Sequence, residues 1–298
     1  MAPATPEVAT PEASRSGSGP PLLFCSLFVI SAGTIALKKA YENGSVAVEL
    51  AVSQQVTGGV LALLLLPRAL RGGLSRRQWA CAAAAGATLA VSNVAAFEGF
   101  ARLPAAILLI FLYSSPLWVA IGQAVFLRTP PTRNETIAVC LAVAGVAVMV
   151  GSTDSHLDLA GVALGLLSGI LFATTLLLAK PLDSVPLSAS VVLPAAGLVA
   201  FVIWPGAGVS GLAEYPHMPW AVAVGVLFWL WMTLLLAGQR HTSPMAAVVV
   251  SAVEPAIVAV LAYLLLSESL GVRELAGGAI LLGGALLAMS DQHRPRRA

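Results

Sequence analysis

The fold is decided by the stretch RLPAAILLIFLYSSPLWVAIGQAVFLRTPPTRNETIAVCLAVAGVAVMVG, residues 102–151, which aligns without a gap on HTSPMAAVVVSAVEPAIVAVLAYLLLSESLGVRELAGGAILLGGALLAMS, residues 241–290. At this offset of 139 residues, Pro116 pairs with Pro255 inside a long apolar run. Identities are few, and the shared pattern carries the match: an apolar run of small residues, a proline in mid-run, a short polar break and a Gly/Ala-rich apolar run. Such a match predicts two copies of one structural module.

The composition is typical of a membrane protein. Of the 298 residues, 58% are hydrophobic and 10% are charged, whereas soluble domains carry about 25% charged residues. The mean hydropathy is +0.89. The 16 Lys and Arg residues nearly balance the 14 Asp and Glu residues, which argues against a nucleic-acid partner. The chain is therefore expected to lie in a lipid bilayer.

Ten apolar runs are long enough to cross a bilayer, which takes roughly 17 to 25 residues. They predict an all-α polytopic membrane protein with ten transmembrane helices, five in each copy of the repeat. The predicted spans are 21–40, 46–66, 78–98, 104–127, 134–151, 159–180, 187–205, 219–239, 243–266 and 274–290.

The predicted domains follow from these spans. Residues 1–20 are rich in Pro, Ala, Ser and Gly and are expected to form a disordered cytoplasmic tail. The first repeat is predicted at 21–151, an external linker at 152–158, the second repeat at 159–290 and a basic cytoplasmic tail at 291–298.

The basic residues predict the orientation, because cytoplasmic loops retain Lys and Arg. An N-terminus in the cytoplasm places 12 of the 16 basic residues inside, and Lys38, Lys39, Arg102 and Arg273 outside. Both termini are then cytoplasmic. Since each copy has five spans, the second copy enters the membrane upside down relative to the first. Inverted repeats provide two mirror-related conformations, which are a basis for alternating access in transporters.

An acid lies near the middle of the ninth span, in the sequence SAVEP at residues 251–255. An ionisable group at this depth costs at least about 2.5 kcal/mol on insertion scales, so Glu254 is expected to face a cavity or a partner. Pro255, like Pro116 in the fourth span, cannot donate a hydrogen bond to the preceding turn, and both are predicted helix kinks. Ser115 stands where the second copy has Glu254. Glu254 has two interpretations: a proton-coupling acid, or a structural acid that holds the ninth helix against a neighbour.

Small residues in the sixth span predict close helix packing, since Gly161, Gly165 and Gly169 form a double GxxxG stripe. No pattern typical of an enzyme is present, whether GxSxG, HExxH, Walker or Rossmann, and the four histidines fall in loops or the tail. The three cysteines lack CxxC spacing. We therefore expect no catalytic residue, no metal site and no cofactor.

The motifs of the second copy are typical of one family. QRHTSP at residues 239–244, SAVEP at 251–255 and the Gly-rich last helix resemble the EamA-like branch of the drug/metabolite transporter superfamily. The repeat of that family ends with a mid-helix Pro, a terminal Gly-Glu-x-Leu and a Gly-rich helix. Two departures stand out: Ser267 replaces the usual Gly before Glu268, and Thr129 occupies the place of that Glu in the first copy.

The resemblance covers residues 22–290 and implies a cavity lined mainly by the first, third, fourth, sixth, eighth and ninth helices, open alternately to each side of the membrane. Mapped onto this chain, it selects as candidate substrate-binding residues Ser31, Thr34, Asn93, Tyr113, Ser115, Phe172, Thr175, Trp231 and Glu254.

The leading hypothesis is a secondary transporter or exporter of the cytoplasmic membrane, an inner membrane in bacteria, that moves a small organic metabolite such as an amino acid or a related compound by alternating access. Protons are a candidate coupling partner. Two alternatives belong to other classes. A membrane scaffold or sensor would keep the helices without a continuous polar cavity, and an intramembrane enzyme would bring catalytic groups within about 3 Å of one another.

Overall fold

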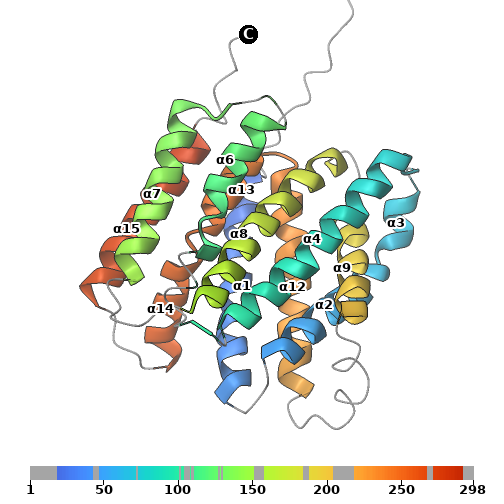
Figure 1. Cartoon of the computed structure of the whole chain (residues 1–298), viewed down its shortest axis with the longest axis horizontal. Coiled ribbons are helices and arrows are strands. Elements are labelled where there is room, and N and C mark those ends of the chain that lie inside the picture. The colour runs from blue at the N-terminus through green and yellow to red at the C-terminus, as the bar shows by residue number, and fades with distance from the viewer. Residues whose placement is uncertain are drawn as a thin grey trace, which may run out of the picture.

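A computed structural model describes residues 19–42, 47–71, 73–100, 102–103, 108, 111–126, 128, 130–150, 158–183, 188–203, 218–266 and 271–290. All regular elements in these ranges are helices (Figure 1). The first copy contains α1 (Gly19–Glu42), α2 (Ala47–Leu63), α3 (Leu66–Leu70), α4 (Arg76–Phe100), α6 (Ser115–Val125) and α7 (Arg133–Val150). The second copy contains α8 (Leu159–Ala179), the 3-10 helix η1 (Lys180–Leu182), α9 (Ala189–Ile203), α12 (Met218–Gln239), α13 (Pro244–Ser251), α14 (Glu254–Leu266) and α15 (Val272–Ser290).

Five helical stretches are long and apolar enough to cross a membrane, by length and composition. They are Gly19–Leu37, Arg76–Gly99, Leu159–Leu182, Val222–Gln239 and Pro244–Leu265. Three shorter apolar helices accompany them: Leu50–Leu63, Ala189–Val202 and Leu275–Ala288. The described residues confirm an all-helical fold, and the full count of ten spans stays a prediction.

The first helix begins at Gly19, inside the stretch predicted to be a tail. Two prolines follow Gly19, and proline fits the first turn of a helix because the N–H it lacks would have no partner there. The remainder of the predicted tail, residues 1–18, lies outside the described residues, as do residues 151–157 and 291–298.

The two repeat prolines interrupt their helices at equivalent places. In the second copy α13 ends at Ser251, a two-residue turn follows, and α14 restarts at Glu254 with Pro255 next in sequence. In the first copy a two-residue turn likewise precedes α6, which begins at Ser115 and has Pro116 in its first turn. The proline nitrogen cannot donate to the previous turn, and its ring clashes there. At both prolines the helix is therefore interrupted by this two-residue turn.

The last helices of the two copies, α7 and α15, pack antiparallel and side by side (Figure 1). A β-carbon at Gly145 would lie 2.9 Å from the carbonyl oxygen of Gly277, and one at Gly284 would lie 3.2 Å from that of Ala138. Both pairs are related by the sequence offset of 139 residues. Each helix therefore makes on its partner the contact that the partner makes on it, as a local two-fold axis requires.

A second pair of crossings obeys the same offset. A β-carbon at Gly86 of α4 would lie 2.8 Å from the Ala196 nitrogen of α9, and one at Gly225 of α12 would lie 2.5 Å from the Thr57 β-carbon of α2. Gly225 and Ala196 follow Gly86 and Thr57 by 139 residues. The repeat thus extends in space well beyond the 50-residue alignment that reveals it in the sequence.

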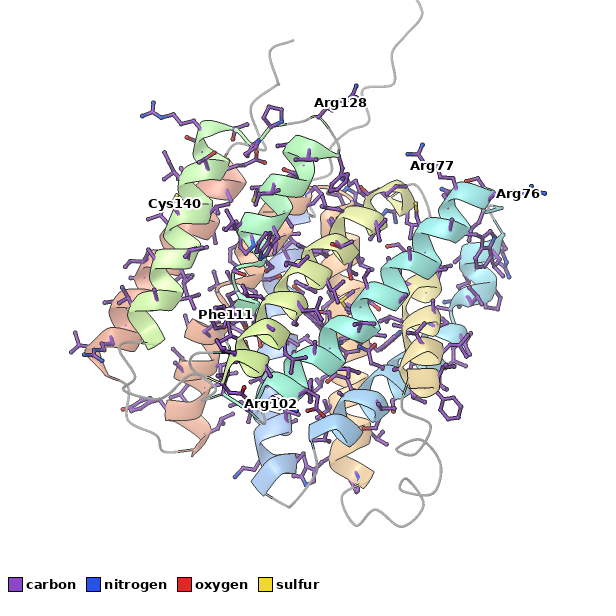
Figure 2. All side chains as sticks on the ribbon, viewed as in Figure 1. Arg76, Arg77, Arg102, Phe111, Arg128 and Cys140 are labelled. Carbon is purple, nitrogen blue, oxygen red and sulfur yellow. The ribbon has the colours of Figure 1, made fainter. Side chains whose placement is uncertain are left out.

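The two ends of the bundle differ in charge. Arg76, Arg77 and Arg128 project from one end, here called the basic end, whereas Arg102 lies towards the other (Figure 2). Lys180 belongs to the basic end, because α8 runs towards it from Asp158, whose carboxylate lies 3.7 Å from the Arg102 guanidinium. This separation matches the distribution that the positive-inside rule predicts.

Candidate functional site

A cavity of about 170 Å³ lies inside the bundle, bordered by α1, α2, α4, α8, α12 and the two helix breaks. A buried water needs roughly 10–15 Å³ on this measure, so the cavity has room for on the order of ten water-sized groups. The predicted substrate-binding residues that line it are Thr34, Asn93, Tyr113, Ser115, Phe172, Trp231 and Glu254.

The other two predicted residues, Ser31 and Thr175, do not border the cavity. Ser31 is fully buried, and its hydroxyl has no partner among the described residues. The Thr175 hydroxyl is used in helix packing, where it lies 2.8 Å from the Thr88 hydroxyl and donates to the Leu171 carbonyl at 3.0 Å. Thr175 therefore faces α4 rather than the cavity, and Ser31 is buried in the packing around α1.

The cavity lies in the half of the bundle away from the basic end. Its lining residues on α1 fall between Ile30 and Leu37, in the later part of that helix. One to two turns nearer the basic end, Leu27, Leu176 and Leu235 are completely buried. Packed leucine side chains therefore separate the cavity from the basic end.

Glu254 joins three segments of the chain at the cavity wall. The Thr34 hydroxyl of α1 donates to Glu254 Oε1 at 2.8 Å, and the Tyr113 hydroxyl, from the turn before α6, also hydrogen-bonds the Glu254 side chain. The helix break makes Glu254 the first residue of α14. The positive end of a helix dipole favours a carboxylate at that position. The break at Pro255 therefore creates the local environment that can accept a buried acid.

Aromatic side chains form one wall of the cavity. The rings of Phe172 and Trp231 stack with centroids 5.9 Å apart, and Phe228 packs against Trp231 at 5.5 Å. Phe228 and Phe97 line the cavity although the sequence did not select them. The signal for Phe228 is its position three residues before Trp231, because such residues share one face of a helix.

Two neutral N–H donors of the lining have no hydrogen-bond partner within the described part of the chain. They are Asn93 Nδ2 and Trp231 Nε1, and both are buried. Ser168, another lining residue that the sequence did not select, is engaged instead: its carbonyl accepts from the Ser92 hydroxyl at 2.9 Å. The described lining of the cavity therefore has unused donors beside the acid Glu254.

The glycine stripe of α8 holds the segment that carries Tyr113. A β-carbon at Gly169 would lie 2.7 Å from the Phe111 carbonyl oxygen, and one at Gly165 or Gly161 would lie 2.8 Å from Leu108 or 2.6 Å from Leu103. Only glycine permits so close an approach of the two segments. The three glycines thus act through packing and bring Tyr113 and its neighbours to the cavity.

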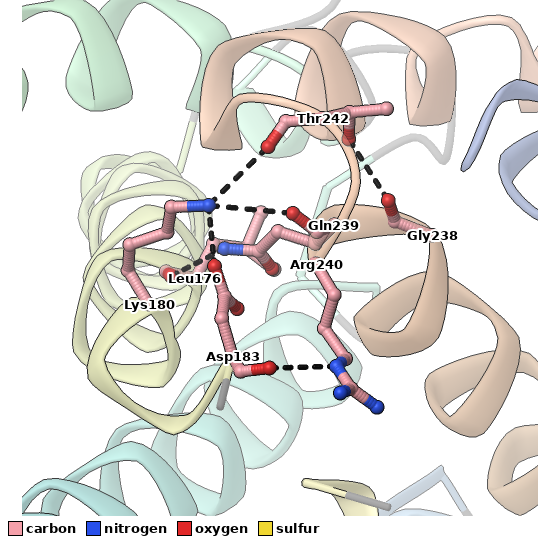
Figure 3. A network of polar contacts seen from close by, with 7 residues as sticks. All are labelled: Leu176, Lys180, Asp183, Gly238, Gln239, Arg240 and Thr242. Carbon is pink, nitrogen blue, oxygen red and sulfur yellow. Dashed lines mark hydrogen bonds and ion pairs between the residues drawn. The ribbon is translucent and has the colours of Figure 1, made fainter. Parts of the chain in front are cut away.

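A polar cluster at the basic end connects the end of α8 to the turn between α12 and α13 (Figure 3). Lys180 forms an ion pair with Asp183 and donates to the carbonyls of Gln239 at 3.4 Å and Thr242 at 3.3 Å. Arg240 Nε donates to the Asp183 carbonyl at 2.7 Å. Burial raises the pKa of the Asp183 carboxyl above its ordinary value, against the lowering effect of the neighbouring Lys180 and Arg240.

Comparisons with known proteins agree with this geometry. The sequence profile of the EamA-like transporter family matches the chain twice, over residues 17–151 and 159–290. A solved crystal structure, described only as a protein, has a TM-score of 0.73 at 16% sequence identity over 94% of this chain and 99% of the other. At this identity the likeness concerns the fold. No curated protein sequence matches the chain.

Proposed function

The chain belongs to the EamA-like transporter family of the drug/metabolite transporter superfamily, and from this premise we propose that it moves a small organic metabolite through the cavity at Glu254 by alternating access. The observation that carries the proposal is a cavity with one acid among its described lining residues, set between two halves related by a local two-fold axis. Such halves can exchange conformations, and the exchange moves access from one side to the other.

The proposal includes the arrangement in the membrane. Ten spans, of which the proline-broken segments are the fourth and ninth, form two inverted repeats, with both termini in the cytoplasm of a cell whose inner or plasma membrane holds the protein. The basic end faces the cytoplasm. The charge separation between Arg76, Arg77 and Arg128 at one end and Arg102 towards the other supports this orientation.

The conformation described here is the one closed towards the basic end. Buried leucines fill the bundle between the cavity and that end, and the cluster of Lys180, Asp183 and Arg240 ties η1 to the α12–α13 turn. Opening towards the cytoplasm then requires these hydrogen bonds to break. The cluster is accordingly proposed as a cytoplasmic closure.

Glu254 is proposed to couple transport to protons. Its carboxyl group faces the cavity, accepts hydrogen bonds from hydroxyls on two other segments, and lies where substrate and proton can compete. Loss or gain of a proton changes the strength of its bonds to Thr34 and Tyr113, and so the attachment of α14 to α1. The competing role, a structural acid that only holds these helices together, predicts a defect in folding rather than in coupling.

The test uses the full chain reconstituted in liposomes that contain a pH-sensitive dye. Each common amino acid, and a set of simple amines, is added with and without an imposed pH gradient. Wild-type protein should carry proton flux that depends on at least one of these compounds, while Glu254→Gln should lose gradient-driven uptake and keep exchange of labelled substrate. A scaffold or sensor would show compound-dependent thermal stabilisation without any flux, and that result would overturn the proposal.

A further inference from the structure

The chemistry of the cavity lining restricts what the cavity can hold. Among the lining residues that the structure describes, Glu254 is the one carboxyl group, and no Lys, Arg or His is present. An ionised carboxyl in a low-dielectric interior needs a compensating positive charge, because hydroxyl hydrogen bonds only partly replace its hydration. When the carboxyl group is ionised, the described part of the lining supplies no such charge.

The aromatic wall suits a cation with an apolar body. Phe172 and Trp231 stack, and Phe228 packs against the same indole, so the three rings lie together on one wall of the cavity that Glu254 also lines. A cation near an aromatic face is attracted by the ring quadrupole, and Trp gives the strongest effect. An anion placed there would meet both the ring faces and the Glu254 carboxylate, which repel it.

The unused N–H donors do not change this preference for a cation over an anion. Asn93 Nδ2 and Trp231 Nε1 can each donate to a neutral acceptor such as a hydroxyl or carbonyl group. Neither carries a charge, so together they offset the charge of a ligand carboxylate less than a guanidinium or ammonium group would. A ligand hydroxyl is therefore accepted more easily than a ligand carboxylate.

From these observations we propose that the cavity selects a monocationic organic amine with a compact apolar body, and discriminates against the same body carrying a carboxylate. The ammonium group hydrogen-bonds the Glu254 carboxylate and the apolar body packs against Trp231, Phe172 and Phe228. The inference rests on the proposed function, since it names the substrate class of the same cavity. The cavity volume of about 170 Å³ suits a ligand of on the order of ten non-hydrogen atoms.

Three probes with one aromatic body test the charge preference: phenethylamine, L-phenylalanine and 3-phenylpropionate. Thermal unfolding of the purified full chain is followed against each compound, with n-butylamine and butyrate as a smaller pair. A ligand that binds the folded state raises its apparent stability. Phenethylamine should bind with a dissociation constant at least about tenfold below those of the other two aromatic probes, as expected for a desolvated charge pair.

Variants assign the preference to the acid. Glu254→Gln should lose the preference for phenethylamine over the two carboxylate probes, and Glu254→Asp should still bind phenethylamine most tightly. Glu98→Gln should behave as wild type, because Glu98 is a partly exposed acid that is not among the described lining residues. Equal or tighter binding of phenylalanine or phenylpropionate overturns the inference, and so does the absence of binding by both amines. Amine binding without flux in proteoliposomes would overturn the transport proposal and leave the inference standing. Flux of another class of compound, without amine binding, would overturn the inference and leave the transport proposal standing.

Discussion

The two repeats share their helix crossings and differ in the chemistry at equivalent positions. The close approaches at Gly86 and Gly225 lie one repeat apart, whereas the residue before the repeat proline is Ser115 in one copy and Glu254 in the other. The comparison teaches that two requirements are separable. On the proposed mechanism, interchange of the two halves depends on equal backbone packing, which is present in both copies, while recognition of the ligand needs the charged group in one copy only.

The two repeats also differ in the charged residues near the ends of the bundle. The cluster of Lys180, Asp183 and Arg240 belongs to the second copy, and the residues 139 positions earlier are Tyr41, Gly44 and Ala101. None of these three carries a charge. The same closure therefore cannot form at both ends from equivalent side chains. The two conformations of this transporter should accordingly differ in stability as well as in direction.

The largest expected effect comes from moving the acid between repeats. Glu254→Ser should weaken binding of phenethylamine at least about tenfold, because the charge pair is lost. Adding Ser115→Glu to that variant should recover part of the binding, since Ser115 also lines the cavity and is also the first residue of a helix. Isothermal titration of the wild type and the two variants measures the effect.

The control for moving the acid from position 254 to position 115 is a variant that changes the cavity lining without changing its charge. Ser168→Ala removes a hydroxyl from the same lining without touching charge, and its effect should be small beside that of Glu254→Ser. Unchanged binding in Glu254→Ser would show that the acid does not meet the ligand. A double variant as weak as the single one would show that only the second copy provides a suitable environment.

The next effect tests the shared crossings. At Gly86 a new β-carbon would meet the backbone of α9, with the Val192 carbonyl oxygen at 2.7 Å, whereas at Gly225 it would meet the Thr57 side chain. The Val192 backbone cannot rotate away, and neither can the Thr57 β-carbon, which is fixed to its own backbone and lies 2.5 Å from the new β-carbon. Gly86→Ala and Gly225→Ala should therefore both lower stability, each within the roughly 1–3 kcal/mol typical of overpacking. Thermal unfolding in detergent measures both.

Gly283→Ala is the matched control, because no described heavy atom beyond the neighbouring backbone of its own helix lies within 4 Å of its β-carbon position. It should leave the unfolding temperature near that of the wild type or raise it slightly, since alanine favours helix more than glycine does. If Gly86→Ala is as well tolerated as Gly283→Ala, α4 and α9 can shift apart, and the crossing is not a fixed contact of this conformation.

How far the sequence predicts this molecule depends on which signals are local. Apolar runs and the position of Pro255 are local, so the helices and the place of the interruption follow from them. Glu254 is conspicuous because acids are costly at such depth. In the sequence, Thr175 and Ser31 look as much like cavity residues as Thr34 does, yet neither borders the cavity. Phe228 borders it, although no polar group marks it in the sequence. The rotation of a helix about its axis is set by packing against other helices, which a uniformly apolar sequence hardly records.

A smaller effect probes how the first repeat assists the acid of the second. Thr34→Val keeps the shape of the side chain and removes the hydroxyl that donates to Glu254 Oε1 at 2.8 Å. A hydrogen bond to a charged group contributes about 1.5–3 kcal/mol, but the Tyr113 hydroxyl and the ligand ammonium group still bind the carboxylate. Amine affinity should therefore fall, by less than in Glu254→Ser, with expression unaltered. Titration of phenethylamine measures it.

Thr233→Val is the corresponding control, because the Thr233 hydroxyl donates at 2.7 Å to the Trp229 carbonyl of its own helix. It should bind as the wild type does. Equal losses of amine affinity in both variants would mean that any threonine-to-valine change disturbs the bundle. The hydrogen bond between Thr34 of α1 and Glu254 of α14 would then not contribute specifically to ligand binding.

The smallest effect concerns the proposed closure formed by Lys180, Asp183 and Arg240 of the second copy. Burial raises the pKa of the Asp183 carboxyl from its ordinary value of 3.8, so the folded protein holds this proton more tightly than the unfolded chain. The stability gained is present below that ordinary value and is lost as the pH rises through the raised pKa. Asp183→Asn cannot titrate, so the wild type minus variant difference in unfolding temperature should fall as the pH is raised from about 4 to about 7. A difference that grows with pH would mean that attraction to Lys180 and Arg240 outweighs burial, and the closure would then tighten, rather than loosen, when Asp183 loses its proton.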